Sequence, residues 1–106
     1  MKLIIMIVQD SDALKLIDAL IDDGIGVTKM STTGGFLRRG NTTLMVGIED
    51  AQTDNTLKII ENCCKKRTKM IMPTSAIGEP YLLGAPIEVA VGGATCFIID
   101  CEQKKF

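Results

Sequence analysis

The fold of this chain is decided by one short stretch, Lys2-Leu3-Ile4-Ile5-Met6-Ile7-Val8. Its apolar side chains occupy both alternating sets of positions, so a β-strand formed here is apolar on both of its faces. Such a strand is typical of the centre of a sheet that is covered on two sides. We therefore expect a central strand over residues 2–8, with other structure packed against each face.

Two amphipathic segments are predicted to be helices that cover one face. Apolar residues recur at spacings of three and four in residues 10–23, with Asp10 or Ser11 as the cap and Gly24 at the end. The stripe of this first helix consists of Ala13, Leu16, Ile17, Leu20 and Ile21.

The second helix is expected to start at Asp50 or Thr53, with Leu57, Ile60 and Cys64 along its stripe. A basic cluster is predicted to end it, because cations near the last carbonyl groups stabilise a helix. A phosphate-binding patch is the alternative for these residues, which are Lys65, Lys66, Arg67 and Lys69.

Further strands are predicted over residues 25–31 and 42–49, and the chain closes with strand-like residues 87–91 and 94–99. The pair Gly92-Gly93 between the last two segments indicates a bulge or a close approach of the backbone. The order is βαββαβ, so we expect one α+β domain over residues 1–106: a four-stranded antiparallel sheet with both helices on one face.

Residues 68–86 hold all three prolines of the chain and show neither helical nor strand periodicity. They are predicted to form a long surface loop before the last strand. Loops of this length in compact domains often serve as lids or binding loops.

The predicted arrangement leaves the second face of the sheet uncovered. With both helices on one side, half of the apolar side chains of residues 2–8 would face water, and monomers rarely expose large apolar patches. We therefore expect this face to form the interface of a cyclic homo-oligomer, with ligand sites in the clefts between subunits.

The most specialised segment lies between the second and third predicted strands and reads Thr32-Thr33-Gly34-Gly35-Phe36-Leu37-Arg38-Arg39-Gly40-Asn41-Thr42-Thr43. Adjacent glycines let backbone amides point together at an anion, and hydroxyl and guanidinium groups add donors. The segment predicts a small-molecule anion site. Arg38 and Arg39 also fit a solvated hairpin tip.

Composition excludes several partners. The formal net charge is −1 and the basic residues are mostly scattered, so DNA or RNA is not expected to bind. The longest apolar run is too short to span a bilayer, and Gln9 and Asp10 follow it without a signal-peptide cleavage site. We expect a cytoplasmic protein with no membrane partner.

The chain has four cysteines and no histidine. Cys63 and Cys64 are neighbours, and an extended segment holds Cys96 and Cys101 beyond disulfide reach. Without histidine, no Ser-His-Asp or Cys-His site exists and the commonest zinc ligand is absent. We expect reduced structural thiols, with no metal and no cofactor.

The chain resembles the PII-like cyclic di-AMP receptors over essentially its full length, through residues 32–43, the motif at residues 92–95 and the motif at residues 7–10. The resemblance implies ferredoxin-like subunits in a homotrimer, with one cyclic di-AMP in each cleft between subunits. It also implies a glycine-rich loop over residues 32–41, a longer loop over residues 68–86, and no enzymatic activity.

The same resemblance implies roles for single residues. Thr28 would lie near a phosphate, while Gly35, Phe36 and Leu37 would surround an adenine, on which an aromatic ring can stack. Considered alone, Phe36 could equally pack back on the domain, and Thr28 could be an ordinary strand residue.

Further along the chain, Asn41 and Gly47 would contact base edges and Phe97 would belong to the wall of the neighbouring subunit. Considered alone, Gly47 could mark a bulge and Phe97 could be an ordinary strand residue. The predicted ligand-binding set comprises Val27, Thr28, Gly35, Phe36, Leu37, Arg38, Asn41, Gly47, Gly92 and Phe97.

Some positions depart from the family pattern. Relatives that bind the dinucleotide typically have Asn in place of Gly24, Arg in place of Gly26, and a Gln-Phe ending where this chain has Lys105-Phe106. A lost charge-assisted contact costs about 1.5–3 kcal/mol, or about one to two powers of ten in affinity. Arg38, Lys29 and Lys105 are candidates to compensate.

Three functional classes therefore follow from the sequence. The first is a receptor that signals through its two loops to an unidentified downstream protein. The second is a PII-like binder of another adenine nucleotide or a small anion. The third is an enzyme, which we do not expect: helix capping explains Asp10, Asp12 and Asp50, and Glu79 stands alone in a loop.

Overall fold

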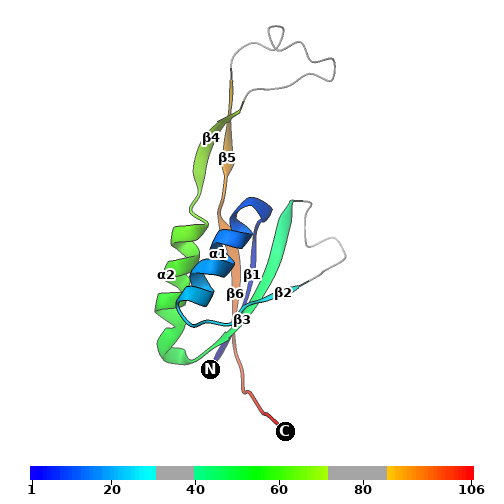
Figure 1. The fold of residues 1–106 in the computed structure, drawn as a ribbon, viewed down its shortest axis with the longest axis vertical. Helices are drawn as coiled ribbons and strands as arrows, with labels where there is room; N and C mark the ends of the chain where they lie inside the picture. Colours follow the sequence, from blue (N-terminus) through cyan, green and yellow to red (C-terminus); the bar gives the residue numbers. More distant parts are fainter. Residues whose placement is uncertain (31–39, 72–85) are drawn as a thin grey trace.

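The computed structural model describes residues 1–30, 40–71 and 86–106 of the chain (Figure 1). The elements follow in the order β1 (Lys2–Gln9), α1 (Asp10–Asp22), β2 (Thr28–Met30), β3 (Asn41–Ile48), the 3-10 turn η1 (Asp50–Gln52), α2 (Thr53–Cys63), β4 (Arg67–Ile71), β5 (Ile87–Val91) and β6 (Ala94–Asp100).

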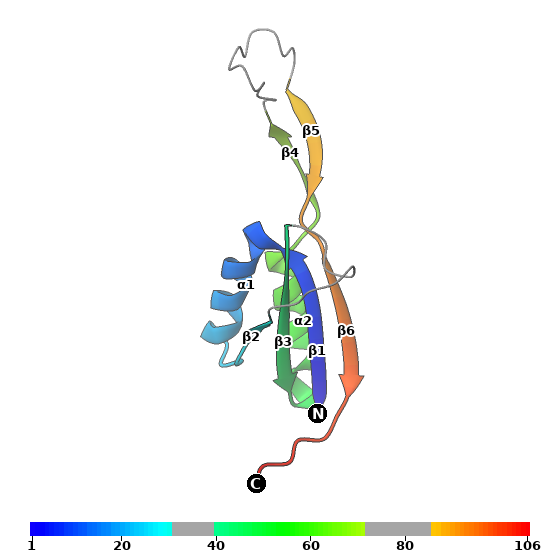
Figure 2. The same ribbon diagram turned by 90° about the vertical axis from the view of Figure 1, so that its right-hand side faces the viewer.

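Four strands form the main sheet, in the order β2-β3-β1-β6, and every neighbouring pair is antiparallel. Strand β1 lies inside the sheet and pairs with β3 from Lys2 to Gln9. Helices α1 and α2 both lie on one side of this sheet (Figures 1 and 2). The predicted α+β, ferredoxin-like βαββαβ arrangement is confirmed, with β6 as the fourth strand.

The hydrophobic core lies between the sheet and the two helices. One alternating set of β1 side chains faces it, and Ile4 and Met6 are fully buried there. Leu16 and Leu20 of α1 pack onto this layer, as the helical spacing predicts. The remaining core side chains are Val8, Ala13, Ile25, Leu44, Val46, Ile48, Ile60, Cys63 and Cys64.

Helix α1 differs from the prediction at its ends. Its N-cap is Gln9, which makes no side-chain capping bond, and the Asp10 carboxylate instead accepts a hydrogen bond from Thr42. Ile21, predicted on the buried stripe, is exposed. Gly24 has a φ of +78°, so the predicted left-handed residue after the helix is present.

Strand β4 corrects the prediction for residues 68–86. Residues 68–71 are not loop: they belong to β4, which pairs with β5 as a separate two-stranded sheet. All five β4 residues are exposed. A strand without a buried face has no reason to alternate polar and apolar residues, and this one therefore left no periodic signal. The rest of that predicted loop, residues 72–85, lies outside the described residues.

The paired strands β4 and β5, called the ribbon below, project from one end of the main sheet (Figure 1). The protein is correspondingly elongated, with extents of 62 × 28 × 19 Å. Within residues 1–30, 40–71 and 86–106, no helix has the length and hydrophobicity needed to cross a membrane.

A substitution at Leu16 tests this core. Leu16 is fully buried, so Leu16→Ala should lower the free energy of unfolding by about 2–5 kcal/mol through lost burial and a residual cavity. Leu14 lies on the same helix and is 70% exposed, so Leu14→Ala should change it by no more than about 0.5 kcal/mol. Urea unfolding, monitored by circular dichroism, measures the free energy of unfolding of both variants. Equal losses of stability would contradict the assigned core face.

Candidate functional site

The face of the main sheet opposite the helices is apolar and only partly covered. Residues directly opposite each other in an antiparallel sheet lie on the same face. Ile5 has Met45 on one side and Phe97 on the other, and Leu3 of the same face lies beside Ile99. Phe97 and Ile99 are 42% and 45% exposed. We call this surface the open face.

Four predicted ligand residues lie on the open face. Thr28 is opposite Met45, while Asn41 and Gly47 alternate with Met45 along β3. Phe97 belongs to the same face through its pairing with Ile5. The strand register therefore places residues from three different strands on one surface.

A single subunit does not bring these four residues into one pocket. Thr28 lies on the edge strand β2 and Phe97 on the opposite edge strand β6, with β3 and β1 between them. Three strand spacings separate them by about 14 Å. Asn41 and Gly47, at opposite ends of β3, are separated by about 20 Å at 3.3 Å per residue.

Other predicted site residues are placed differently. Val27 packs against the hydrophobic core, so its side chain is turned away from the open face. The remaining members of the predicted set, which are Gly35, Phe36, Leu37 and Arg38, lie outside the described residues.

A polar pocket of about 250 Å³ lies where β1 ends and β6 begins. It brings together two predicted residues, Asn41 and Gly92, with the side chains of Gln9 and Lys66. Lysine carries an ammonium donor and glutamine and asparagine carry amides, so these lining residue types suit an anion or a base edge. The other lining residues are Ile7, Val8, Gly93, Ala94 and Thr95.

The glycine pair shapes one wall of this polar pocket. Gly92 and Gly93 have φ of +84° and +89°, and a Cβ on Gly92 would lie 2.4 Å from the carbonyl oxygen of Lys65. The Gly92 amide donates to Oε1 of Gln9 at 2.7 Å, and the Gly93 amide donates to the carbonyl oxygen of Cys64. The predicted close approach of the backbone is confirmed.

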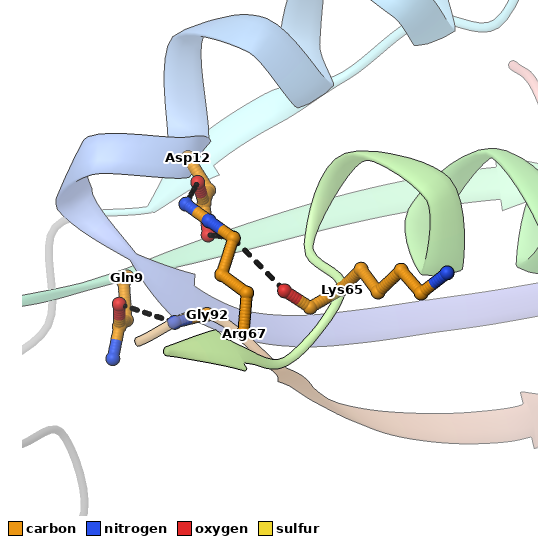
Figure 3. Close-up of polar contacts among 5 residues, drawn as sticks. All are labelled: Gln9, Asp12, Lys65, Arg67 and Gly92. Carbon is orange, nitrogen blue, oxygen red and sulfur yellow. Dashed lines mark hydrogen bonds and ion pairs between the residues drawn. The ribbon is translucent and has the colours of Figure 1, made fainter. Parts of the chain in front are cut away.

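Beside the pocket, Arg67 forms an ion pair with Asp12 (Figure 3). Nη2 donates to Oδ1 at 2.8 Å and Nη1 donates to Oδ2 at 3.4 Å, while Nη1 also donates to the carbonyl oxygen of Lys65 at 2.9 Å. Asp12 is only 3% exposed. Its hydrogen bond and negative charge raise the pKa of Arg67 above its ordinary value.

This ion pair corrects the interpretation of the basic cluster. Helix α2 ends at Cys63, and the structure shows no basic residue in its last turn. Lys65 and Lys66 follow the helix, whereas Arg67 begins β4 and pairs with a carboxylate from α1. The helix-end explanation is therefore wrong for Arg67.

A second pocket, of about 510 Å³, lies beside α2 and the start of β6. Leu57, Ile60, Cys64 and Cys96 form its apolar lining, and Lys65 and Lys66 also border it. Burial, aided by the negative charge of Asp12, raises the pKa of Cys64 to about 11, and burial also raises that of Cys96. These thiols are therefore poor nucleophiles near neutral pH.

All four cysteines are free. In the three described ranges, the structure shows no cluster of three or more cysteine, aspartate or glutamate side chains able to hold a metal ion.

The sequence analysis missed two of the described site residues, Gln9 and Asp12, and named Lys66 only within the alternative phosphate-binding patch. Gln9 and Lys66 line the polar pocket, and Asp12 holds Arg67 beside it. Gln9 lies within the family motif at residues 7–10, which was the available signal. Nothing in the sequence links Asp12 to Arg67, since 55 positions separate them.

The described elements, a four-stranded sheet with two helices on one face, an open face and a polar pocket at one end, define a protein of ferredoxin-like architecture. The sequence model of the cyclic-di-AMP receptor family matches residues 1–106. This chain therefore belongs to the cyclic-di-AMP receptor family.

One solved structure agrees with the fold. The chain is similar to a functionally unknown protein from Pediococcus pentosaceus, with 43% sequence identity and a TM-score of 0.77. The similarity covers 99% of this chain and 95% of that one. The two proteins therefore share their fold along nearly the whole chain.

Thiol reactivity tests the assignment of the buried cysteines. In native protein at pH 8, Cys64 should react with a disulfide reagent far more slowly than Cys101, because Cys64 is 2% exposed and its pKa is about 11. Peptide mass spectrometry after timed labelling measures each rate, and labelling in guanidinium is the control in which all four cysteines react. Fast native labelling of Cys64 would contradict its burial.

Proposed function

We propose that this protein is a non-enzymatic cytoplasmic receptor for the second messenger cyclic di-AMP. It acts as a homotrimer, binds one dinucleotide in each cleft between subunits, and signals to a downstream protein through rearrangement of its two loops. The observation that carries the proposal is the family match along residues 1–106.

The open face supports assembly between subunits. Leu3, Ile5, Phe97 and Ile99 form an apolar surface that is only partly covered within one chain. Burying a half-exposed side chain of this size contributes on the order of 1 kcal/mol, so several of them favour association. The family resemblance makes a trimer the expected assembly.

The two edges of the sheet support a ligand site between subunits. Thr28 and Phe97 lie on opposite edge strands of one subunit, about 14 Å apart across the sheet. A ligand that contacts a Thr28 and a Phe97 at short range fits more easily between two subunits than on one subunit. Such a site would lie where the β2 edge of one subunit meets the β6 edge of the next. This favours a site shared by neighbouring subunits.

Each proposed ligand residue has a matching chemical role. The Thr28 hydroxyl donates to a phosphate, Phe97 offers an aromatic face, and the Asn41 amide can pair with an adenine edge. Among the described residues, a Cβ on Gly47 would have only Met1 Cε within 4 Å, at 3.9 Å, which leaves space for a base. We propose that Gly35, Phe36, Leu37 and Arg38 complete the site, together with the backbone at Val27 and Gly92.

The absence of catalysis is supported by the pairing of the described candidate carboxylates. Asp12 is bound to Arg67, Asp10 accepts from Thr42, and Asp50 is paired with the amino group of Met1. None of these three lines either of the two pockets described above, where a general base would have to reach a bound substrate.

Calorimetry tests the proposed ligand. Cyclic di-AMP should bind with one site per chain, and cyclic di-GMP, ATP and AMP should bind much more weakly, because the site is built to read two adenines. Light scattering on the same sample should give the mass of three chains. Clear heat from ATP or AMP, with none from cyclic di-AMP, would overturn the proposal.

The alternative is a PII-like binder of another adenine nucleotide or a small anion. It is favoured by Gly24 and Gly26, which replace the Asn and Arg expected to contact cyclic di-AMP. No atom of residues 1–30, 40–71 or 86–106 lies within 4 Å of a Cβ built at either position, so crowding in the described part of the chain requires neither glycine. The Lys66 ammonium in the polar pocket is compatible with a small anion.

Restoring the missing side chain separates these two ligand classes. Gly26 has open space around it and no positive φ, so Gly26→Arg should fold normally. It should tighten cyclic di-AMP binding by about 10- to 100-fold by adding a charge-assisted contact. Gly26→Ala is the matched control and should leave Kd unchanged. An unaltered Kd in Gly26→Arg would show that this position does not face the ligand.

A further inference from the structure

We infer that the Asp12–Arg67 ion pair is a latch that couples the polar pocket to the ribbon. Arg67 and Asp12 are positioning residues: they hold the pocket wall and the ribbon base in one arrangement. The part of this inference that concerns cyclic di-AMP rests on the proposed function, whereas the part that concerns the ribbon does not.

The ribbon depends on its base for its orientation. Every residue of β4 is exposed, and β5 has only Val89 and Val91 partly covered. A two-stranded sheet of this kind is marginally stable by itself. Contacts where the ribbon joins the main sheet therefore decide how firmly it is held.

Both strands of the ribbon are fastened at this base. Arg67, the first residue of β4, binds the Asp12 carboxylate of α1 and the carbonyl oxygen of Lys65. On the other strand, Gly92 follows β5 directly and donates to Gln9 at the end of β1. Figure 3 shows these contacts side by side.

The guanidinium also limits where Gly92 lies. A Cβ on Gly92 would be 2.6 Å from Arg67 Nη1 and 2.4 Å from the Lys65 carbonyl oxygen, so the glycine backbone packs directly on the latch. Gly92 and Lys66 line the polar pocket, and Arg67 is the next residue after Lys66. A ligand that moves this wall must therefore move the ribbon base, and the reverse also holds.

The buried negative charge of Asp12 makes this carboxylate depend on Arg67. Asp12 is 3% exposed, so its carboxylate depends on Arg67 for compensation, and the two hydrogen bonds of the fork fix the guanidinium plane. Removing Arg67 leaves a buried carboxylate without its partner. Asp12→Asn removes the charge and keeps the size, which releases Arg67 without opening a cavity.

Hydrogen exchange with mass spectrometry tests the latch. In the ligand-free protein, Asp12→Asn and Arg67→Gln should each speed exchange in residues 67–71 and 87–91, while β1 and β3 stay protected. The double variant should exchange no faster than the worse single variant, because both substitutions break one pair. Lys69→Gln is the control: it removes a charge from the same strand and ribbon face without touching Asp12, and should leave exchange unchanged.

Binding measurements then test the coupling. Cyclic di-AMP should slow ribbon exchange in the parent protein, and Asp12→Asn should weaken its binding by at least about fivefold. A purely structural role for the pair would instead speed exchange across the whole protein, and that result overturns the latch. Faster ribbon exchange with an unchanged Kd overturns the coupling.

The ribbon experiment also separates this inference from the proposed function. If cyclic di-AMP does not bind the parent protein, the proposed ligand is wrong, yet the ligand-free exchange pattern still decides whether the ion pair holds the ribbon. Unchanged ribbon exchange in Asp12→Asn overturns the latch even where cyclic di-AMP binds tightly.

Discussion

Strand β1 is hydrogen-bonded on both sides and carries apolar side chains on both faces. A strand of this kind must be covered twice, and one pair of helices covers it only once (Figure 2). Ile4 and Met6 are buried by the helices, whereas Ile5 and Leu3 are only partly covered. The remaining apolar surface favours association between subunits, because burial of apolar area is the main favourable contribution to the free energy of assembly.

The end of β1 places the polar contacts. Helix α1 begins at Asp10, directly after Gln9, so no linker separates the strand from the helix. The last strand residue and the first helical turn therefore lie beside the base of the ribbon, where Gln9 meets Gly92 and Asp12 meets Arg67. The junction of β1 and α1 thus supplies Gln9 to the pocket wall and Asp12 as the partner of Arg67 in the ribbon.

Elements with a buried face could be predicted from the sequence. Strand β1, both helices and strand β3 were identified from periodicity, and Gly24 and Gly92 from their backbone requirements. Strand β4 could not be found in this way, because its exposed residues do not alternate, whereas β5 does alternate and was predicted although none of its side chains is buried either. Arg67 at the start of β4 binds a carboxylate far away in the chain, and no local sequence pattern records such a partner.

The candidate site was predictable in a similar, partial way. The family resemblance named Thr28, Asn41, Gly47 and Phe97, but only the strand register shows that they share the open face. The polar pocket was harder to predict from the sequence, because Lys66 belongs to a basic cluster that also suits the end of a helix. Pairing over long sequence separations is the information that periodicity lacks.

The separation of Thr28 and Phe97 has a further thermodynamic consequence. If a ligand contacts Thr28 of one subunit and Phe97 of the next, it binds only the assembled form. Ligand binding and assembly then stabilise each other through thermodynamic linkage. The partly covered open face would then be a receptor's means of tuning affinity, since weaker association lowers the fraction of chains that present a complete cleft. Because Gln9 of β1 accepts from Gly92 at the ribbon base and Ile5 of β1 lies on the open face, one strand would connect assembly, ligand binding and the orientation of the ribbon.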